Sequence, residues 1–331
     1  MAMTKQRNRK LRQLKQSIYI VCEGTNTERI YFEEIAQQKD VFDKYAITVY
    51  PSEEEQKKSK TGGLTIYTDA VNLVKLAQKE IDNYDEVWAV FDKNGYTKHQ
   101  EVFSTANKRT KKVNIAFSSI AFEHWILLHY EKNQTGFLKS QEISDYLNSQ
   151  GYFLNYSKKA NISVYLKIQD QTQTAIENAA WLRREMAKNL AACGDKIYEL
   201  NPYVTVDKLV MKLLDMNPVT YGYIKETLRI SDISITVNDV RRHNGITLSS
   251  RIVNHGKNPY LVNNNSDDFY LIDEDKNNFP LCIDAPMLIE PSFTQDIDLI
   301  FSSSNATGKF ELKLSRNKEI LIILLDNVNK I

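Results

Sequence analysis

Two acidic residues in the first third of the chain each follow a short apolar run. Glu23 comes directly after residues 18–22, and Asp92 comes directly after residues 87–91. Both runs have the composition of buried strands. Ligands and catalytic groups collect at the carboxyl ends of strands in open α/β sheets, so we expect both carboxylates at one edge. The pair indicates a divalent-metal site, for Mg²⁺ or Mn²⁺, suited to phosphodiester chemistry. Alternatively, each acid only ends a strand and caps the next turn.

Three further residues are candidates for the same site. Asn94, two residues after Asp92, offers a neutral oxygen, which is a weaker metal ligand than a carboxylate. Glu123 is the candidate third acid, although an acid at a helix start also complements the helix dipole. His129 is a candidate general base or phosphate contact, the alternative being a buried structural histidine. The candidate catalytic residues are Glu23, Asp92, Glu123 and His129, and the candidate metal ligands are Glu23, Asp92, Asn94 and Glu123.

Two segments are candidates for binding phosphate. Gly24, Thr25 and Thr27 belong to a turn that leads into a helix, where backbone N–H groups and the helix dipole attract anions. A threonine followed by glutamate is also an ordinary helix cap, and the glycine spacing and lysine of a P-loop are absent from this turn. Lys158 and Lys159 could hold phosphates if they line the same cleft, but paired lysines are commonly solvated.

The predicted elements that position these residues alternate between strand and helix. The order strand, helix, strand, helix, strand, helix, strand up to residue 117 favours an α/β fold with a largely parallel sheet covered by helices on both faces. A mostly helical extension follows over residues 121–215. After residue 229, short β-rich runs separated by turn residues predict a C-terminal antiparallel β-sandwich of about one hundred residues.

The length of 331 residues indicates about two domains. We expect a basic arm over residues 1–16, an α/β domain over residues 17–225 and a β-sandwich domain over residues 230–331. The arm carries six Lys and Arg residues and no acid, so it is either a solvated tail or a contact for a nucleic-acid backbone.

Composition narrows the class of protein. The formal net charge is +1, so no global field requires a nucleic-acid partner. The three cysteines are far apart and show no paired spacing, which fits a reducing cytoplasm and argues against a structural zinc site. No apolar run approaches the length of a membrane span, so we expect a cytoplasmic protein with no membrane partner.

Taken in order, the motifs resemble the RloB family over about residues 17–215. The matching pieces are Glu23-Gly24, Thr27-Glu28, Tyr31-Phe32, Asp92-Lys93-Asn94, Ser118, Phe122 to Trp125, His129, Lys158-Lys159, Asn201-Pro202, Thr205-Val206 and Leu209-Val210. The resemblance implies a Toprim-like α/β fold and a role in prokaryotic anti-phage or abortive-infection systems, often beside an ATPase partner protein. Related Toprim-like effectors are metal-dependent nucleases. Asn94 departs from the Asp-x-Asp pattern of the family, and the predicted β-sandwich lies outside the resemblance.

Two hypotheses remain from the sequence. The first is a Mg²⁺-dependent nuclease that acts on DNA or RNA, with Glu23, Asp92 and Glu123 holding the metal. The second is a non-catalytic sensor or partner module that binds a nucleotide or nucleic acid without cutting it. In the second hypothesis the β-sandwich docks another protein. Under either hypothesis, we expect the β-sandwich to contact a partner protein or a second copy of the chain, which would make a homo-oligomer. Asn94 and the neutral overall charge favour the second hypothesis, whereas the clustered acids favour the first.

Overall fold

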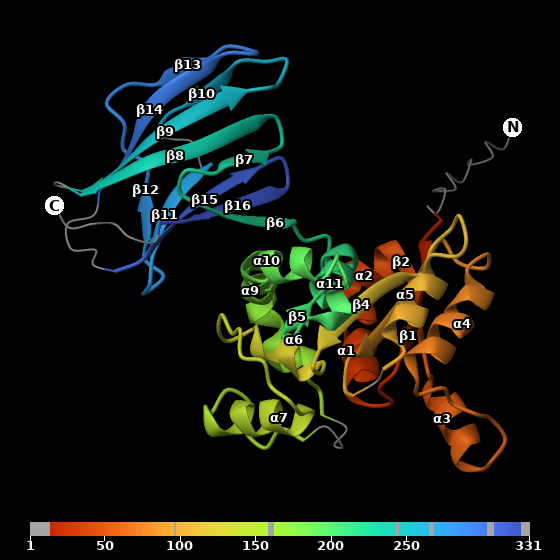
Figure 1. Ribbon diagram of the computed structural model, residues 1–331. Coiled ribbons are helices and arrows are strands. Elements are labelled where there is room, and N and C mark those ends of the chain that lie inside the picture. Colours follow the sequence, from red (N-terminus) through yellow and green to blue (C-terminus); the bar gives the residue numbers. More distant parts are fainter. Residues whose placement is uncertain are drawn as a thin grey trace, which may run out of the picture. The chain divides into compact units, whose positions relative to one another are not determined.

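The computed structural model describes residues 14–95, 97–157, 162–242, 245–264, 268–302 and 308–325 (Figure 1). Packing divides the chain into two compact units. The first comprises residues 1–127, 135–170 and 201–214, and the second comprises residues 128–134, 171–200 and 215–331. The sequence predicts the limits of domains that fold on their own. The division into two packed units does not test independent folding, so these limits stay a prediction.

The first unit is built on a five-stranded sheet with the order β2-β1-β3-β4-β5. Its strands are β1 (Gln16–Cys22), β2 (Tyr45–Tyr50), β3 (Glu86–Asp92), β4 (Asn114–Ser119) and β5 (Tyr203–Val204). The first four run parallel, and β5 is antiparallel to β4. Central strands β1 and β3 are buried along most of their length because helices cover both faces. The structure thus confirms the predicted α/β region with a mostly parallel sheet.

Two groups of helices cover this sheet. α4 (Ala70–Glu80) and α5 (His99–Ala106) contact each other on one face, while α1 (Thr27–Ala36), α2 (Lys39–Lys44) and α11 (Val206–Leu214) contact one another on the other face. α4 buries the apolar stripe that contains Leu73 and Val74, and the Asp69 carboxylate accepts the N–H of Asn72 to cap it. The remaining helices of this unit are α3 (Glu53–Lys60), α6 (Glu123–Leu127), α7 (Ser140–Ser149) and α8 (Tyr165–Ile168).

The second unit consists mainly of antiparallel strands, as predicted for the end of the chain. One sheet has the order β12-β11-β15-β16-β6, another has the order β14-β9-β8-β7, and β10 and β13 form a small pair. The strands are β6 (Val219–Tyr223), β7 (Thr227–Ile230), β8 (Ile233–Arg242), β9 (Ile246–Asn254), β10 (Tyr260–Val262), β11 (Phe269–Asp273), β12 (Asn278–Pro280), β13 (Met287–Ile289), β14 (Thr294–Phe301), β15 (Phe310–Arg316) and β16 (Glu319–Leu324).

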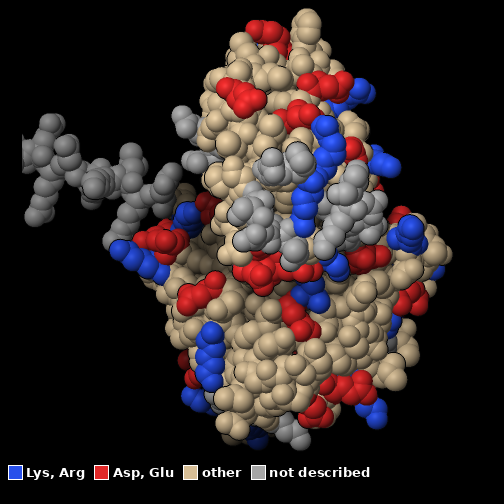
Figure 2. Space-filling view, turned by 90° about the vertical axis from the view of Figure 1, so that its left-hand side faces the viewer, with Lys and Arg blue, Asp and Glu red and all other residues tan. Residues whose placement is uncertain are grey.

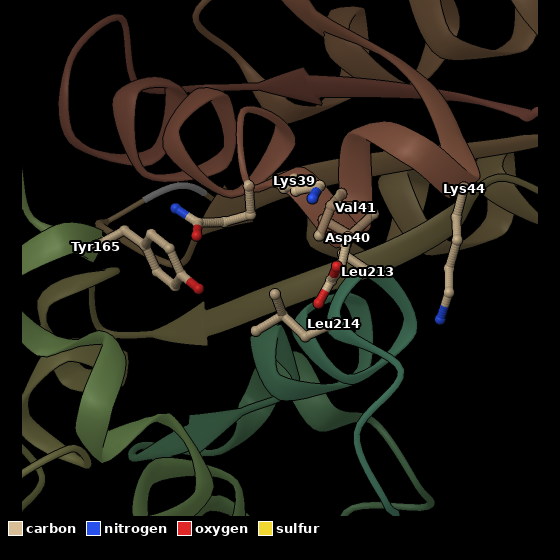
Figure 3. Close-up of a pocket in the computed structure, with 8 residues that line it drawn as sticks. Lys39, Asp40, Val41, Lys44, Tyr165, Leu213 and Leu214 are labelled. Atoms are coloured by element: carbon tan, nitrogen blue, oxygen red, sulfur yellow. The ribbon is translucent and has the colours of Figure 1, made fainter.

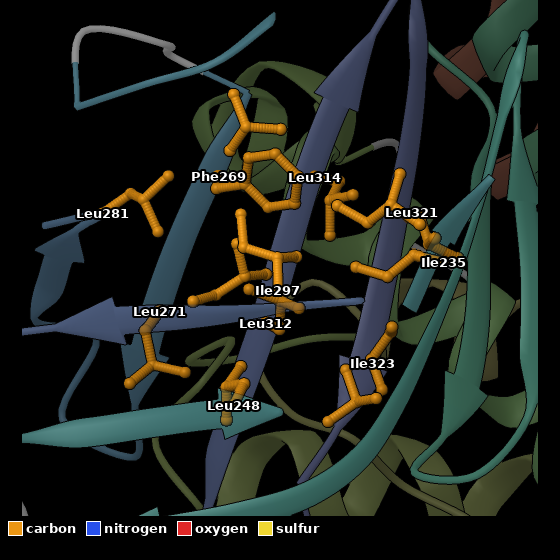
Figure 4. Packing of buried hydrophobic residues seen from close by; sticks show 14 of the residues in the cluster. Ile235, Leu248, Phe269, Leu271, Leu281, Ile297, Leu312, Leu314, Leu321 and Ile323 are labelled. Atoms are coloured by element: carbon orange, nitrogen blue, oxygen red, sulfur yellow. The ribbon is translucent and has the colours of Figure 1, made fainter. Parts of the chain in front are cut away.

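Side chains from the two larger sheets form one apolar core. Figure 4 shows Leu248 and Ile297 from one sheet close to Leu312 and Ile323 from the other. Alternate residues of β9 and β15 are buried, which is the period of a sheet with one covered face. β16 is instead buried along nearly its whole length, because its other face packs in a second cluster.

Helical segments also belong to the second unit. They are α9 (Thr172–Glu185), α10 (Ala187–Ala192) and the short 3₁₀ helix Ile197–Glu199. α9 packs on β6, where Ala180 and Tyr221 form a buried cluster with Ile320, Ile322 and Leu324 of β16. β6 pairs with β16 in parallel, so the last strand lies between β15 and β6. Over the described part of the chain, each helix is too short or too polar to span a bilayer.

Candidate functional site

Glu23 lies at the carboxyl end of β1 and contacts the end of the neighbouring strand β3. Its backbone N–H donates to the carbonyl of Val90 at 2.9 Å, which extends the pairing of the two strands. Its carboxylate Oε2 accepts the backbone N–H of Asp92 at 3.2 Å. Asp92 is the last residue of β3 and is buried, whereas Glu23 is half-buried. The sheet therefore places the Glu23 carboxylate directly against the Asp92 backbone at its carboxyl edge.

Ser118 lies beside Asp92 on the next strand, β4. The two residues are register partners in the parallel β3–β4 pair, so their side chains emerge on the same face of the sheet. Ser118 is 1% exposed, and its hydroxyl makes no hydrogen bond with the residues that the structure describes. A buried hydroxyl left in this state costs about 1–3 kcal/mol. The position beside Asp92 is therefore suited to a water molecule or a ligand oxygen.

The side chain of Glu28 lies against Gly24 in the turn after Glu23. A Cβ atom on Gly24 would lie 1.7 Å from Oε2 of Glu28, so a larger residue here would displace the Glu28 carboxylate. Glu28 is in the first turn of α1 and is only 2% exposed. A buried carboxylate thus borders the turn for which the sequence predicts phosphate binding. The phosphate-binding roles of Gly24, Thr25 and Thr27 stay a prediction.

Two side chains from different helices hold the backbone of this turn at Thr25. The carbonyl of Thr25 accepts a hydrogen bond from Nε of Arg29 at 2.8 Å and another from Nε2 of Gln56 at 3.2 Å. Arg29 is a buried residue of α1 and forms an ion pair with Glu33 one turn later. Gln56 belongs to α3, which follows β2. The conformation of the turn is therefore set by donors from both neighbouring helices.

Glu123 starts α6 and is fully buried. The hydroxyl of Tyr156 donates to its Oε1 at 2.7 Å, and the same hydroxyl hydrogen-bonds the side chain of Thr27 at the start of α1. Burial, and then the negative charge of Glu123, raises the pKa of the Tyr156 hydroxyl, so the phenol stays protonated and keeps donating. Tyr156 thereby links the first turn of α1 to the first turn of α6.

We expect Tyr156→Phe to lower the free energy of unfolding by about 1–3 kcal/mol, because the buried Glu123 carboxylate loses a hydrogen bond while the ring remains. Chemical denaturation followed by circular dichroism measures the change. Tyr165→Phe is the matched control, because its ring is also buried but its hydroxyl faces the hollow in Figure 3. Equal stability of both variants would show that the Tyr156–Glu123 contact does not support the fold.

The other predicted site residues are placed as follows. Asn94 is exposed, and its backbone N–H donates to the carbonyl of Ile120 at 2.9 Å. His129 is buried and belongs to the second unit, so its predicted role beside the acids stays a prediction. Lys158 and Lys159 lie outside the described residues. Within the described ranges, no group of three or more His, Cys, Asp or Glu side chains is arranged to hold a metal ion.

A hollow of about 380 Å³ in the first unit lies apart from these acids. Figure 3 shows Tyr165 and Leu214 turned toward the same space, with residues of α2 along its other side. Its lining residues are Gln38, Lys39, Asp40, Val41, Lys44, Tyr165, Leu213 and Leu214. None of the candidate site residues belongs to this lining, so this hollow does not account for the predicted chemistry.

The family match decides the relationship of this chain to known proteins. Residues 18–213, more than half of the chain, match the family described as RloB-like protein. The chain belongs to the RloB-like family. The RloB-like region contains the acids at the sheet edge and the Thr27–Tyr156–Glu123 contacts, while all strands from β6 onward lie beyond the match.

Other comparisons add little. No curated protein matches the chain significantly. The crystal structure of the yjhA protein from Bacillus subtilis is 14% identical, with a TM-score of 0.27, and the similarity covers 32% of this chain and 99% of that one. The β-glucosidase EmGH1 from Erythrobacter marinus is 10% identical, with a TM-score of 0.22, covering 94% of this chain and 46% of that one. Both TM-scores are too low to indicate a shared fold.

Three residues near the acids were absent from the predicted site. Ser118 and Glu28 belong to sequence motifs of the RloB resemblance. Only the structure shows that both residues are buried next to the candidate site. Tyr156 has no sequence signal, because its partners Glu123 and Thr27 are far from it in the chain.

Proposed function

We propose that this RloB-like chain has a Toprim-like fold and acts as a Mg²⁺- or Mn²⁺-dependent nuclease on DNA or RNA. The observation that carries the proposal is the contact of the Glu23 carboxylate with the Asp92 backbone at the carboxyl edge of a parallel sheet. We place it in a cytoplasmic anti-phage system of the abortive-infection type, working with an ATPase partner protein. These wider roles rest on the family resemblance.

The donor chemistry at this edge fits Mg²⁺. Mg²⁺ is held by one or two carboxylates, several waters and substrate phosphates rather than by a cage of protein ligands. Glu23 and Asp92 supply two carboxylates, and the buried Ser118 hydroxyl beside Asp92 is suited to a water of the ion's hydration shell. The absence of a three-ligand cluster among the described residues is compatible with such an open, hydrated site.

Different residues of the chain have different roles in the proposed reaction. Glu23 and Asp92 would hold the ion, and a bound ion would stabilise the negative charge that develops on the phosphate. Tyr156 keeps Glu123 in one orientation by donating to its Oε1. Arg29 and Gln56 fix the turn after Glu23, so the carboxylate is positioned before substrate arrives.

Incubation of the full chain with transfer RNA, plasmid DNA and single-stranded oligonucleotides tests the proposal. We expect cleavage of at least one substrate with Mg²⁺ or Mn²⁺ and none with EDTA. Cleavage that persists in EDTA would contradict the metal requirement. Binding without cleavage under every metal condition would replace the proposal with the alternative below.

The alternative is a sensor or partner module that binds a nucleotide or nucleic acid without cutting it and docks a protein through its β-rich region. Asn94 favours it, because an exposed asparagine stands where the family pattern has an acid. On the face in Figure 2, acidic and basic side chains are interspersed, in keeping with the net charge of +1.

A further inference from the structure

α3 is a helix without a buried residue. It spans Glu53–Lys60, and none of its side chains packs into the core of the first unit. Figure 1 shows that it stands out from the rest of the unit. A capping box fixes its start, because Glu55 N–H donates to the Ser52 hydroxyl at 3.3 Å and Ser52 N–H donates to the Glu55 carboxylate at 2.8 Å. Apolar packing therefore does not explain why this segment is helical and held in place.

α3 is nevertheless attached to the turn that carries Glu23. Gln56, in the middle of the helix, donates to the carbonyl of Thr25, the same oxygen that Arg29 contacts from α1. The Gln56 side chain therefore identifies the face of α3 that is turned toward the candidate site. Because residues four apart share a helix face, Lys60 lies on that face one turn further along.

The charges of α3 are separated along its axis. Its three glutamates occupy the first turn and its three lysines, Lys57, Lys58 and Lys60, occupy the last turns. Lys57 is 3.9 Å from Glu53 and thus has an acid of its own helix as a neighbour. Lys58 is two residues from Gln56 and lies on the opposite face. Lys60 is exposed. It lies at the basic end of the helix and on the helix face nearest the turn.

We propose that α3 contacts the sugar–phosphate backbone of a nucleic acid bound at the candidate site, with the Lys60 ammonium group against a phosphate. This inference rests on the proposed function and identifies α3 as a helix that contacts the backbone of the substrate. A lysine is a point charge on a flexible stem, so it binds phosphate without reading the base sequence. α3 would therefore position any substrate strand relative to Glu23 and Asp92 without selecting its sequence.

Binding of a fluorescently labelled single-stranded oligonucleotide to the full chain, measured by anisotropy over a salt series with Ca²⁺ replacing Mg²⁺, tests this contact. We expect Lys60→Ala to weaken binding several-fold and to reduce the slope of log affinity against log salt by about 0.7, the value for one phosphate contact on a single strand. Lys58→Ala removes the same charge from the opposite face and serves as the control, with a smaller effect expected on both quantities. Circular dichroism of both variants checks that the fold is retained.

The outcomes separate this inference from the proposed function. Equal effects of the two substitutions, or no effect of either, would overturn the role of Lys60, even if the wild-type chain cleaves nucleic acid. If the wild-type chain neither binds nor cleaves any oligonucleotide, the proposed function and this inference both fail.

Discussion

Glu23→Gln is expected to lower metal-dependent cleavage at least about a hundredfold, which corresponds to about 2.7 kcal/mol of transition-state stabilisation. The substitution removes the negative charge that would hold the ion, and metal ions contribute several kcal/mol to such reactions. The amide oxygen of glutamine can still accept the Asp92 N–H, so the contact seen at 3.2 Å can persist. Initial cleavage rates at saturating Mg²⁺ and at limiting Mg²⁺ measure the effect.

Glu101→Gln is the matched control for this prediction. Glu101 is an exposed residue of α5, outside both the candidate site and α3, and its substitution removes the same charge from the first unit. We expect its cleavage rate to stay within about twofold of wild type, since exposed substitutions change stability by less than about 0.5 kcal/mol. Comparable losses in both variants would mean that overall charge, and not the acid at the sheet edge, governs activity.

Leu321→Ala is expected to destabilise the second unit by about 2–5 kcal/mol, the usual cost of a cavity at a buried leucine. Leu321 is fully buried in the core between the two larger sheets, on the strand that lies between β15 and β6. Figure 4 shows it beside other apolar side chains of this core. Chemical denaturation of the full chain, followed by circular dichroism, measures the loss.

Leu261→Ala provides the comparison for the core substitution. Leu261 belongs to the same unit but is 45% exposed on β10, so the same change in side chain leaves no buried cavity. We expect a change within about 0.5 kcal/mol. Equal destabilisation by the two substitutions would contradict the assignment of Leu321 to the core.

The alternation of strand and helix before residue 117 predicted the α/β region because each apolar run there is bounded by clear turn residues. The β-rich end of the chain was predicted from short β-rich runs separated by turn residues, and the structure places strands such as β9 and β15 in these runs. The parallel pairing of β6 with β16 could not be predicted, because it joins segments about a hundred residues apart and has no local signal.

The candidate site likewise has some features that could be predicted from the sequence and others that could not. Glu23 and Asp92 could be predicted as neighbours because each follows an apolar run that predicts a strand. Adjacent parallel strands must end at the same edge of the sheet. The partner of Glu123 could not be found, because Tyr156 reaches it through tertiary packing. The anion-binding role of Gly24 stays a prediction, and the contact of Glu28 with this glycine is seen only in the structure. Side-chain packing of this kind leaves no period or spacing in the sequence.

Titration of the purified chain with Mg²⁺ and with Mn²⁺ in a calorimeter tests the central claim most directly, because it requires neither a substrate nor a partner. We expect saturable binding by the wild-type chain, and binding that is at least about tenfold weaker in Asp92→Asn, since the amide is a poorer ligand than the carboxylate. Circular dichroism of the variant must match wild type for the comparison to hold. Absence of saturable binding by the wild-type chain, or unchanged affinity in a folded Asp92→Asn variant, would contradict a metal site at this edge of the sheet.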